Sequence, residues 1–290
     1  MKRFILSQPP DPRGFIRLKG RDYHYLVRVR RLRGGDLFPA ILPDGTEVQV
    51  RVHSTDGDTL LGECLAHEKA PGAVSAADTQ KKAPGTLPIP KERLPPIVLF
   101  QALPKGTKMD LIVRQAAEGG ITEIVPFASE HSIPKLRGGG EEKLRRWERI
   151  IREARQQSGS GIATAIHAPL DMDGLAGYWE SIRSDRPGSL GLLFHQDPVD
   201  QGPVGSTPLE QGSLHGYLGS RPELTAMAIG PEGGFSPAEV SRFLAMGFKS
   251  LKIGDTILRT ETAALYGAAA IRIILLESDS WTHKSQQQIQ

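Results

Sequence analysis

The sequence predicts a two-domain protein, in which a small β-barrel precedes an α/β domain built on a parallel sheet. Three observations lead to this prediction. Turn signals recur at nearly regular spacing through the first 66 residues, a proline-rich stretch follows, and from residue 97 onward apolar runs alternate with amphipathic segments. We therefore assign residues 1–67 to the barrel, 68–96 to a flexible linker or insertion, 97–278 to the α/β domain and 279–290 to a C-terminal tail.

The barrel prediction rests on short strands separated by turns. We expect a short helix at residues 22–31, and then strands at 37–42, 47–52 and 59–64, bounded by the turn sequences Gly34-Gly35-Asp36, Pro43-Asp44-Gly45 and Asp56-Gly57-Asp58. In the second strand Val48, Val50 and Val52 alternate with polar residues, which is typical of a strand with one buried face.

The expected linker, residues 68–96, contains six prolines, five alanines and no aromatic residue. Such a stretch buries too little apolar surface to offset the entropy lost on ordering.

The α/β domain is predicted from the alternation of strands and helices. We expect strands at 97–100, 121–126, 162–166, 190–194, 224–229 and 251–253, and helices at 107–118, 141–158 and 260–276. This order predicts a parallel sheet covered on both faces, with ligands at the carboxyl ends of its strands. Residues 197–223, with four prolines and five glycines, are expected to form a long surface loop.

Composition and charge narrow the class of protein. The 290 residues are 39% hydrophobic and 24% charged, as in globular proteins. The only cysteine, Cys64, excludes an intrachain disulfide and a cysteine metal cluster. No apolar run approaches the ~20 residues of a membrane helix, and Pro9-Pro10 interrupts any signal-peptide core. We expect a cytoplasmic protein that uses neither a membrane nor a metal.

The net charge is +3, but the first 36 residues carry ten Lys or Arg against three Asp. A basic segment at one end is typical of a protein that binds a polyanion. A solvated basic surface is the alternative.

The most informative stretch is a glycine loop between a strand and a helix. It reads Gly230-Pro231-Glu232-Gly233-Gly234-Phe235, and Ser236, Pro237 and Glu239 then give the N-cap, first position and capping box of a helix. The glycines indicate a sharp bend or a close approach to a ligand. The loop matches neither phosphate-binding glycine motif, which leaves a neutral adenosine-like ligand or a plain turn.

A second loop, residues 252–262, again leads from a strand into a helix. Thr260 is the expected cap, and Glu261 suits the positive end of the helix. We expect Ile257 and Leu258 to face inward, so Arg259 beside them needs a partner. That partner is either an acid (Glu232, Asp255 or Glu261) or a ligand.

The two loops, Gly230–Ser236 and Ile257–Ala263, together resemble the signature of the RsmE-type small-subunit rRNA uridine N3-methyltransferases of the SPOUT class. The resemblance extends to His24-Tyr25-Leu26 with residues 29–36, which are similar to the family's RNA-binding segment, and to residues 143–158, which are similar to its central helix.

The resemblance implies a PUA-like barrel followed by a trefoil-knotted domain, S-adenosylmethionine as cofactor, a homodimer, and 16S rRNA of the small ribosomal subunit as partner. Arg259 becomes the candidate for stabilising charge on the uracil carbonyls, and Glu232 either orders the loop or receives a proton. The expected RNA-binding residues are His24, Arg28, Arg30, Arg31 and Arg33. The expected cofactor-binding residues are Phe194, His195, Ile229, Gly230, Pro231, Glu232, Gly233, Gly234, Ile253, Gly254, Ile257, Leu258, Thr260, Glu261 and Thr262.

Three positions depart from the family's usual basic residues, namely Gln115, His131 and Ser160. Two other hypotheses are therefore kept. One is a non-catalytic RNA-binding or ribosome-assembly protein on the same scaffold. The other is a nucleotide-dependent metabolic enzyme, which would require a phosphate-binding loop that we do not find in the sequence.

Overall fold

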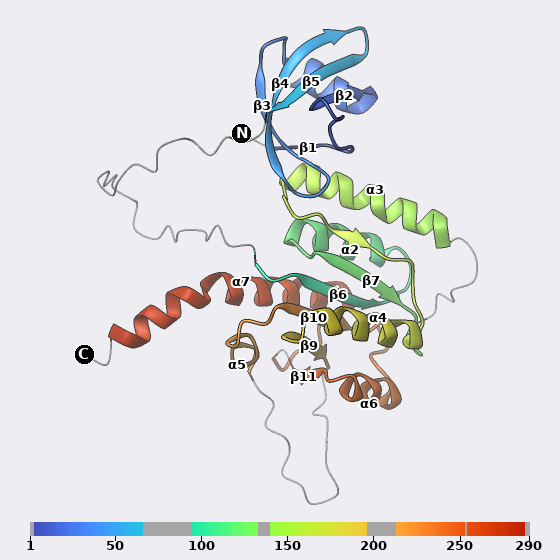
Figure 1. Ribbon diagram of the computed structural model, residues 1–290. Coiled ribbons are helices and arrows are strands. Elements are labelled where there is room, and N and C mark those ends of the chain that lie inside the picture. The colour runs from blue at the N-terminus through green and yellow to red at the C-terminus, as the bar shows by residue number, and fades with distance from the viewer. Residues whose placement is uncertain (1–2, 66–93, 133–139, 196–212, 253, 288–290) are drawn as a thin grey trace, which may run out of the picture. The chain divides into compact units, whose positions relative to one another are not determined.

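The computed structural model describes residues 3–65, 94–132, 140–195, 213–252 and 254–287, with side chains up to residue 277 in the last range. The chain divides into two compact units (Figure 1). One comprises Met1–Pro88 with Arg155–Ala163, and the other comprises Ile89–Ala154 with Thr164–Gln290. The expected linker lies outside the described residues, apart from its last three. No helix of the described ranges is long and apolar enough to cross a membrane.

The first unit is built on a five-stranded sheet in the order β1-β3-β4-β5-β2. All neighbours are antiparallel except β1, which runs parallel to β3. The three predicted strands, β3 to β5, are confirmed. The other two were not predicted, because β1 has only two residues and β2 alternates with basic side chains. The strands are β1 (Phe4–Ile5), β2 (Phe15–Lys19), β3 (Leu37–Ile41), β4 (Glu47–Asp56) and β5 (Thr59–Leu65).

The core of this unit confirms the alternation seen in the sequence, since Val48, Val50 and Val52 are all buried in one cluster. The predicted helix is present as α1 (Gly20–Tyr23) and a π-helical turn, η1 (His24–Val29). It ends earlier than predicted, because Arg31 has a φ of 58°, in the left-handed region that a helix cannot continue through.

The second unit is a six-stranded sheet in the order β11-β9-β10-β6-β7-β8, and every pair in it is parallel. The chain runs outward from β6 to β8 and fills the other half with the last three strands, so the order reverses between β6 and β10. Ligands bind at such a switch point, at the carboxyl ends of the strands. The strands are β6 (Ile97–Ala102), β7 (Glu123–Phe127), β8 (Ala165–Ile166), β9 (Ser189–Phe194), β10 (Leu224–Ile229) and β11 (Lys249–Leu251).

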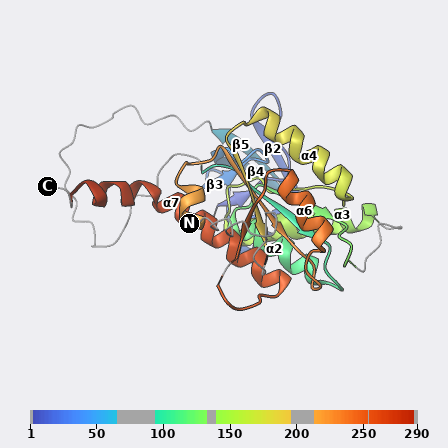
Figure 2. The same cartoon turned by 90° about the horizontal axis from the view of Figure 1, so that it is seen from below.

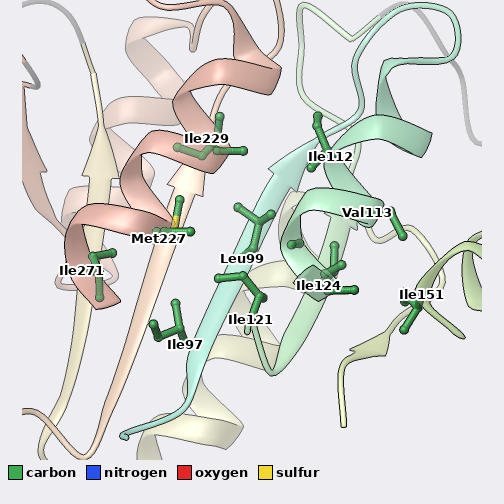
Figure 3. Packing of buried hydrophobic residues seen from close by; sticks show 14 of the residues in the cluster. Ile97, Leu99, Ile112, Val113, Ile121, Ile124, Ile151, Met227, Ile229 and Ile271 are labelled. Carbon is green, nitrogen blue, oxygen red and sulfur yellow. The ribbon is translucent and has the colours of Figure 1, made fainter. Parts of the chain in front are cut away.

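Helices cover both faces of this sheet (Figures 1 and 2). One face packs against α2 (Lys108–Gly119), α3 (Gly140–Ser158) and α7 (Thr260–Gln287). Figure 3 shows Leu99 of β6 beneath Ile112 of α2, with Met227 of β10 beside Ile271 of α7. The other face packs against α4 (Met172–Asp185) and α6 (Pro237–Ala245). Strands β6 and β10 are therefore buried on both sides, which explains their uninterrupted apolar runs.

Several elements differ from the prediction. Helix α4 was not predicted, and α5 (Leu214–Leu218) lies in the stretch expected to be a loop. Helix α7 continues to Gln287 instead of ending at Leu276. Strand β11 lies two residues earlier in the chain than the predicted strand 251–253, and residue 253 lies outside the described residues. The trefoil knot stays a prediction, since strand order and pairing do not establish how the chain is threaded.

Candidate functional site

The glycine loop connects β10 to α6 as predicted. The capping box is confirmed: Ser236 Oγ accepts the Glu239 amide, and the Glu239 carboxylate accepts the Ser236 amide at 2.9 Å. The buried Glu239 also accepts hydrogen bonds from Ser129 Oγ and the Glu130 amide. The helix start is thus fixed to the segment that follows β7.

A side chain is disfavoured at two glycines of this loop. Gly234 has a φ of 69°, which favours glycine. A Cβ added at Gly233 would lie 3.0 Å from the Cβ of His131. The imidazole Nδ1 of His131 lies 3.1 Å from the carbonyl oxygens of both Gly233 and Gly234. Since carbonyls only accept, Nδ1 is the donor, and His131 holds the loop in place.

The second loop is joined to the first by one buried side chain. Thr260 is the first residue of α7, but its hydroxyl donates to the Gly230 carbonyl at 2.7 Å instead of capping the helix. The same hydroxyl accepts from Nε2 of Gln101, a fully buried residue of β6, at 3.0 Å. Thr260 and Gln101 therefore hold the two loops together over the end of the sheet.

These loops enclose a cavity of about 1090 Å³ at the carboxyl ends of β9, β10 and β11. Its size is at the upper end of the ~300–1,000 Å³ of typical ligand pockets. Twelve of the fifteen expected cofactor-binding residues line it. Ile253 lies outside the described residues, and Glu261 and Thr262 do not line the cavity. The lining also includes Lys108, Leu251, Lys252, Asp255, Thr256, Arg259 and Ala263.

Glu232 is held by several donors. Its carboxylate accepts the Lys108 ammonium at 2.7 Å and the Lys105 amide at 3.2 Å. Desolvation alone would raise the pKa of Glu232, but the hydrogen bonds from Lys108, its own amide and Lys105 together lower it below the usual carboxyl value. Glu232 is thus an anchored, ionised carboxylate.

Arg259 lies at the cavity and is exposed. It makes no ion pair with any described residue, so the proposed salt bridge is absent: Glu232 and Glu261 pair with Lys108, and Asp255 pairs with Lys252 at 3.3 Å. The prediction that Ile257 faces inward is wrong, because its exposed fraction is 79%. An apolar residue in a loop is not buried by its type alone, because no regular period orients its side chain.

The expected RNA-binding residues lie together on η1 and the turn that follows it, in the first unit. His24, Arg28, Arg31 and Arg33 are exposed, and Arg30 is half-buried. Within the described ranges none of the four arginine side chains has an acidic partner, so their charges face solvent.

Two residues outside both loops were missed in the sequence. Lys108 reaches the site from the start of α2, and Gln101 from the end of β6. The signal for Gln101 was a polar residue ending an apolar strand.

Residues 90–272 match the RNA methyltransferase domain family, and residues 18–63 match the RNA methyltransferase PUA domain. The chain belongs to the RNA methyltransferase family. This RNA methyltransferase is 29% identical over 275 residues to the ribosomal RNA small subunit methyltransferase E of Synechocystis sp., covering 94% of this chain and 78% of that one. It is 32% identical to the enzyme of that name from Aquifex aeolicus, over 60% and 67% of the two chains.

The fold of this RNA methyltransferase is also found in solved structures. The ribosomal RNA small subunit methyltransferase E from Neisseria gonorrhoeae, bound to S-adenosyl methionine, superposes with a TM-score of 0.64 at 22% identity, over 94% of this chain and 98% of that one. This likeness confirms the predicted fold class, a PUA-like domain followed by a parallel α/β methyltransferase domain.

Proposed function

We propose that this RNA methyltransferase transfers the methyl group of S-adenosylmethionine to N3 of a uridine in the 16S RNA of the small ribosomal subunit. The observation that carries the proposal is the cavity at the ends of β9 to β11, where Thr260 joins the two loops and Arg259 stands without an acidic partner among the described residues. Relatives that cover most of this chain are named for small-subunit rRNA methylation. A cytoplasmic location is part of this proposal, because the proposed substrate is ribosomal RNA.

The lining suits a nucleoside cofactor. The glycine loop borders the cavity, where an adenosine-like ligand would bind, and Phe194, Ile229 and Leu258 add apolar walls. When bound, S-adenosylmethionine supplies an electrophilic methyl group on its sulfonium. The twelve lining residues predicted from the sequence are the proposed contacts. Glu261 and Thr262, at the start of α7, do not line the cavity and are not proposed as contacts.

Arg259 is the proposed catalytic residue. Methylation would form a bond from N3 to the methyl carbon while the bond from that carbon to the sulfonium breaks and leaves a neutral thioether. N3 would give up its proton to water, so negative charge would develop on the two flanking carbonyl oxygens. A fixed cation beside those oxygens lowers the barrier, and its effect is greatest where water is excluded. Arg259 is suited to this role because no carboxylate of the described chain neutralises it.

Glu232 is assigned to ordering the loop. Its lowered pKa makes it a weak base at neutral pH, and its oxygens are already engaged by Lys105 and Lys108. We therefore do not assign it the uracil proton.

The basic segment of the first unit is the proposed RNA contact. Exposed Arg28, Arg31 and Arg33 would bind phosphates of the RNA. These contacts would give affinity and fix the position of the protein along the RNA, while the target base is selected in the pocket. The target base has to leave its stack to reach the methyl group.

A homodimer is proposed from the exposed apolar side chains of the second unit. Tyr266 and Ile273 are 55% and 52% exposed and lie seven residues apart on α7, hence on one face. Leu265 and Leu111 of the neighbouring α2 are also exposed. We expect Ile273→Glu to convert a dimer into a monomer in analytical ultracentrifugation, and a wild-type monomer would contradict this.

The test of the proposed function is single-turnover methyl transfer to small-subunit rRNA. We expect Arg259→Ala to reduce the rate by roughly a hundredfold or more, with little change in cofactor affinity or melting temperature. Arg259→Lys should restore only part of the rate, because the ammonium of lysine keeps the charge but lacks the planar, two-pronged donor geometry of the guanidinium. Normal transfer by Arg259→Ala, or a melting loss large enough to explain inactivity, would assign this residue to structure.

Two measurements separate an enzyme from a non-catalytic RNA-binding protein. Calorimetry should show binding of S-adenosylmethionine, and its absence would favour the non-catalytic protein. Mass mapping of rRNA from a strain without this protein should show the loss of one N3-methyluridine, which also identifies the target.

A further inference from the structure

Lys108 forms ion pairs with two carboxylates near the proposed catalytic arginine, one that lines the same cavity and one two residues further along the chain. Its ammonium lies 2.7 Å from Glu232 Oε1 and 3.8 Å from Glu261 Oε2. These acids come from different elements, the glycine loop and the start of α7. The charge of Arg259 acts on Lys108 in the opposite direction to theirs, so all four groups share one electrostatic environment.

The position of Lys108 is unusual for a lysine. It is the first residue of α2, where the helix dipole favours anions and disfavours cations. Helix stability therefore does not explain a lysine here, whereas the two carboxylates do. Oε2 of Glu261 is buried and has no hydrogen-bond partner in the described chain, which leaves Lys108 as its nearest compensating charge.

Without that ammonium the two acids would compete for Arg259. A guanidinium binds a carboxylate through two parallel hydrogen bonds, which makes it a better partner than an ammonium. Glu261 follows Arg259 by two residues, and Glu232 lines the same cavity. An Arg259 paired with either acid would no longer be free to act on a substrate.

We propose that Lys108 is a positioning residue, which neutralises Glu232 and Glu261 and thereby keeps the guanidinium of Arg259 available for the uracil carbonyls. This inference rests on the proposed role of Arg259 in methyl transfer.

The first experiment is a set of variants measured by single-turnover transfer. We expect Lys108→Met to slow the reaction by at least tenfold and Lys108→Arg to retain most of the rate. Lys108→Met/Glu261→Gln should be at least fivefold faster than Lys108→Met, because one of the two competing carboxylates is gone and only Glu232 remains. Lys249→Met, a similar change at an exposed strand residue, is the matched control. A merely structural lysine would make the double variant slower still, and that result would overturn the inference.

The second experiment does not depend on methyl transfer. Phenylglyoxal modifies free guanidinium groups, and peptide mapping by mass spectrometry reports the rate at Arg259. We expect modification at Arg259 to be several-fold slower in Lys108→Met and restored in the double variant. An equal rate in all three proteins would overturn the inference, even if the wild type methylates rRNA. Inactive wild-type protein with the expected modification pattern would refute the proposed function alone.

Discussion

Replacement of Thr260 by valine tests the connection between the two loops. Valine has nearly the same shape as threonine but lacks the hydroxyl, and Thr260 is 5% exposed. The change removes the 2.7 Å hydrogen bond to the Gly230 carbonyl and the 3.0 Å hydrogen bond from Gln101. The Gln101 amide keeps its bond to the Ala102 carbonyl, so one of its two donors loses its partner.

The magnitude follows from these two bonds. The bond to the Gly230 carbonyl contributes about 1 kcal/mol net, and loss of the bond from Gln101 leaves a buried donor unsatisfied, which costs about 1–3 kcal/mol. Gly230 borders the cavity, where water can reach its carbonyl. We therefore expect a loss of about 2–4 kcal/mol in the free energy of unfolding. For a unit of this size the melting temperature should fall by roughly 4–16 °C.

Urea unfolding and calorimetric titration with S-adenosylmethionine are the assays. Looser loops should weaken cofactor binding by roughly tenfold, which corresponds to about 1.4 kcal/mol. Thr260→Ser keeps the hydroxyl and should remain close to wild type. Thr225→Val is the matched control, because the Thr225 hydroxyl is buried without a partner in the described residues, so its removal should be neutral or stabilising. Equal effects at the two positions would refute the reasoning.

Three further predictions concern the glycine loop, the basic segment and a half-buried carboxylate. Gly233→Val should abolish cofactor binding in calorimetry while unfolding stays cooperative, because its side chain would collide with His131; wild-type affinity would contradict the pocket. RNA affinity should fall linearly with salt on logarithmic axes, and the slope should flatten when Arg28, Arg30 and Arg31 are replaced by alanine; an unchanged slope and affinity would mean a solvated surface. Hydrogen bonds from His167 and Tyr178 outweigh desolvation and lower the pKa of Glu123. Glu123→Gln should therefore lower the free energy of unfolding at neutral pH. The difference in this free energy between the variant and the wild type should vanish as the pH falls through the lowered pKa. A pH-independent difference in melting temperature would contradict this last assignment.

Local sequence patterns were sufficient to predict an element where its residues interact with neighbours close in the sequence. The capping box of Ser236 and Glu239 was predicted because it satisfies helix amides within four residues. The buried face of β4 was predicted from the alternation of Val48, Val50 and Val52, since a strand turns every second side chain inward. Both loops were predicted at the carboxyl ends of parallel strands, because each follows a predicted strand and precedes a predicted helix.

Other elements are not visible in local patterns. Helix α4 was missed, although Leu175 and Trp179 are buried. Its glycines and polar residues weaken the helical spacing of apolar residues on which the prediction depends. Burial of Ile257 was predicted from its apolar side chain, yet it is exposed, since a loop's direction depends on what it packs against.

The sequence by itself determined most of the strands, the two loops and their likeness to a family of RNA methyltransferases. Only the tertiary structure decided which residues act together at the site. Gln101 and Thr260 are 159 positions apart and share a hydrogen bond, and Lys108 meets Glu232 across 124 positions. Such pairs cannot be recognised from a periodic pattern in the sequence, because the folding of the sheet brings together residues that are far apart in the chain. The charge balance around Arg259 is therefore a property of the fold.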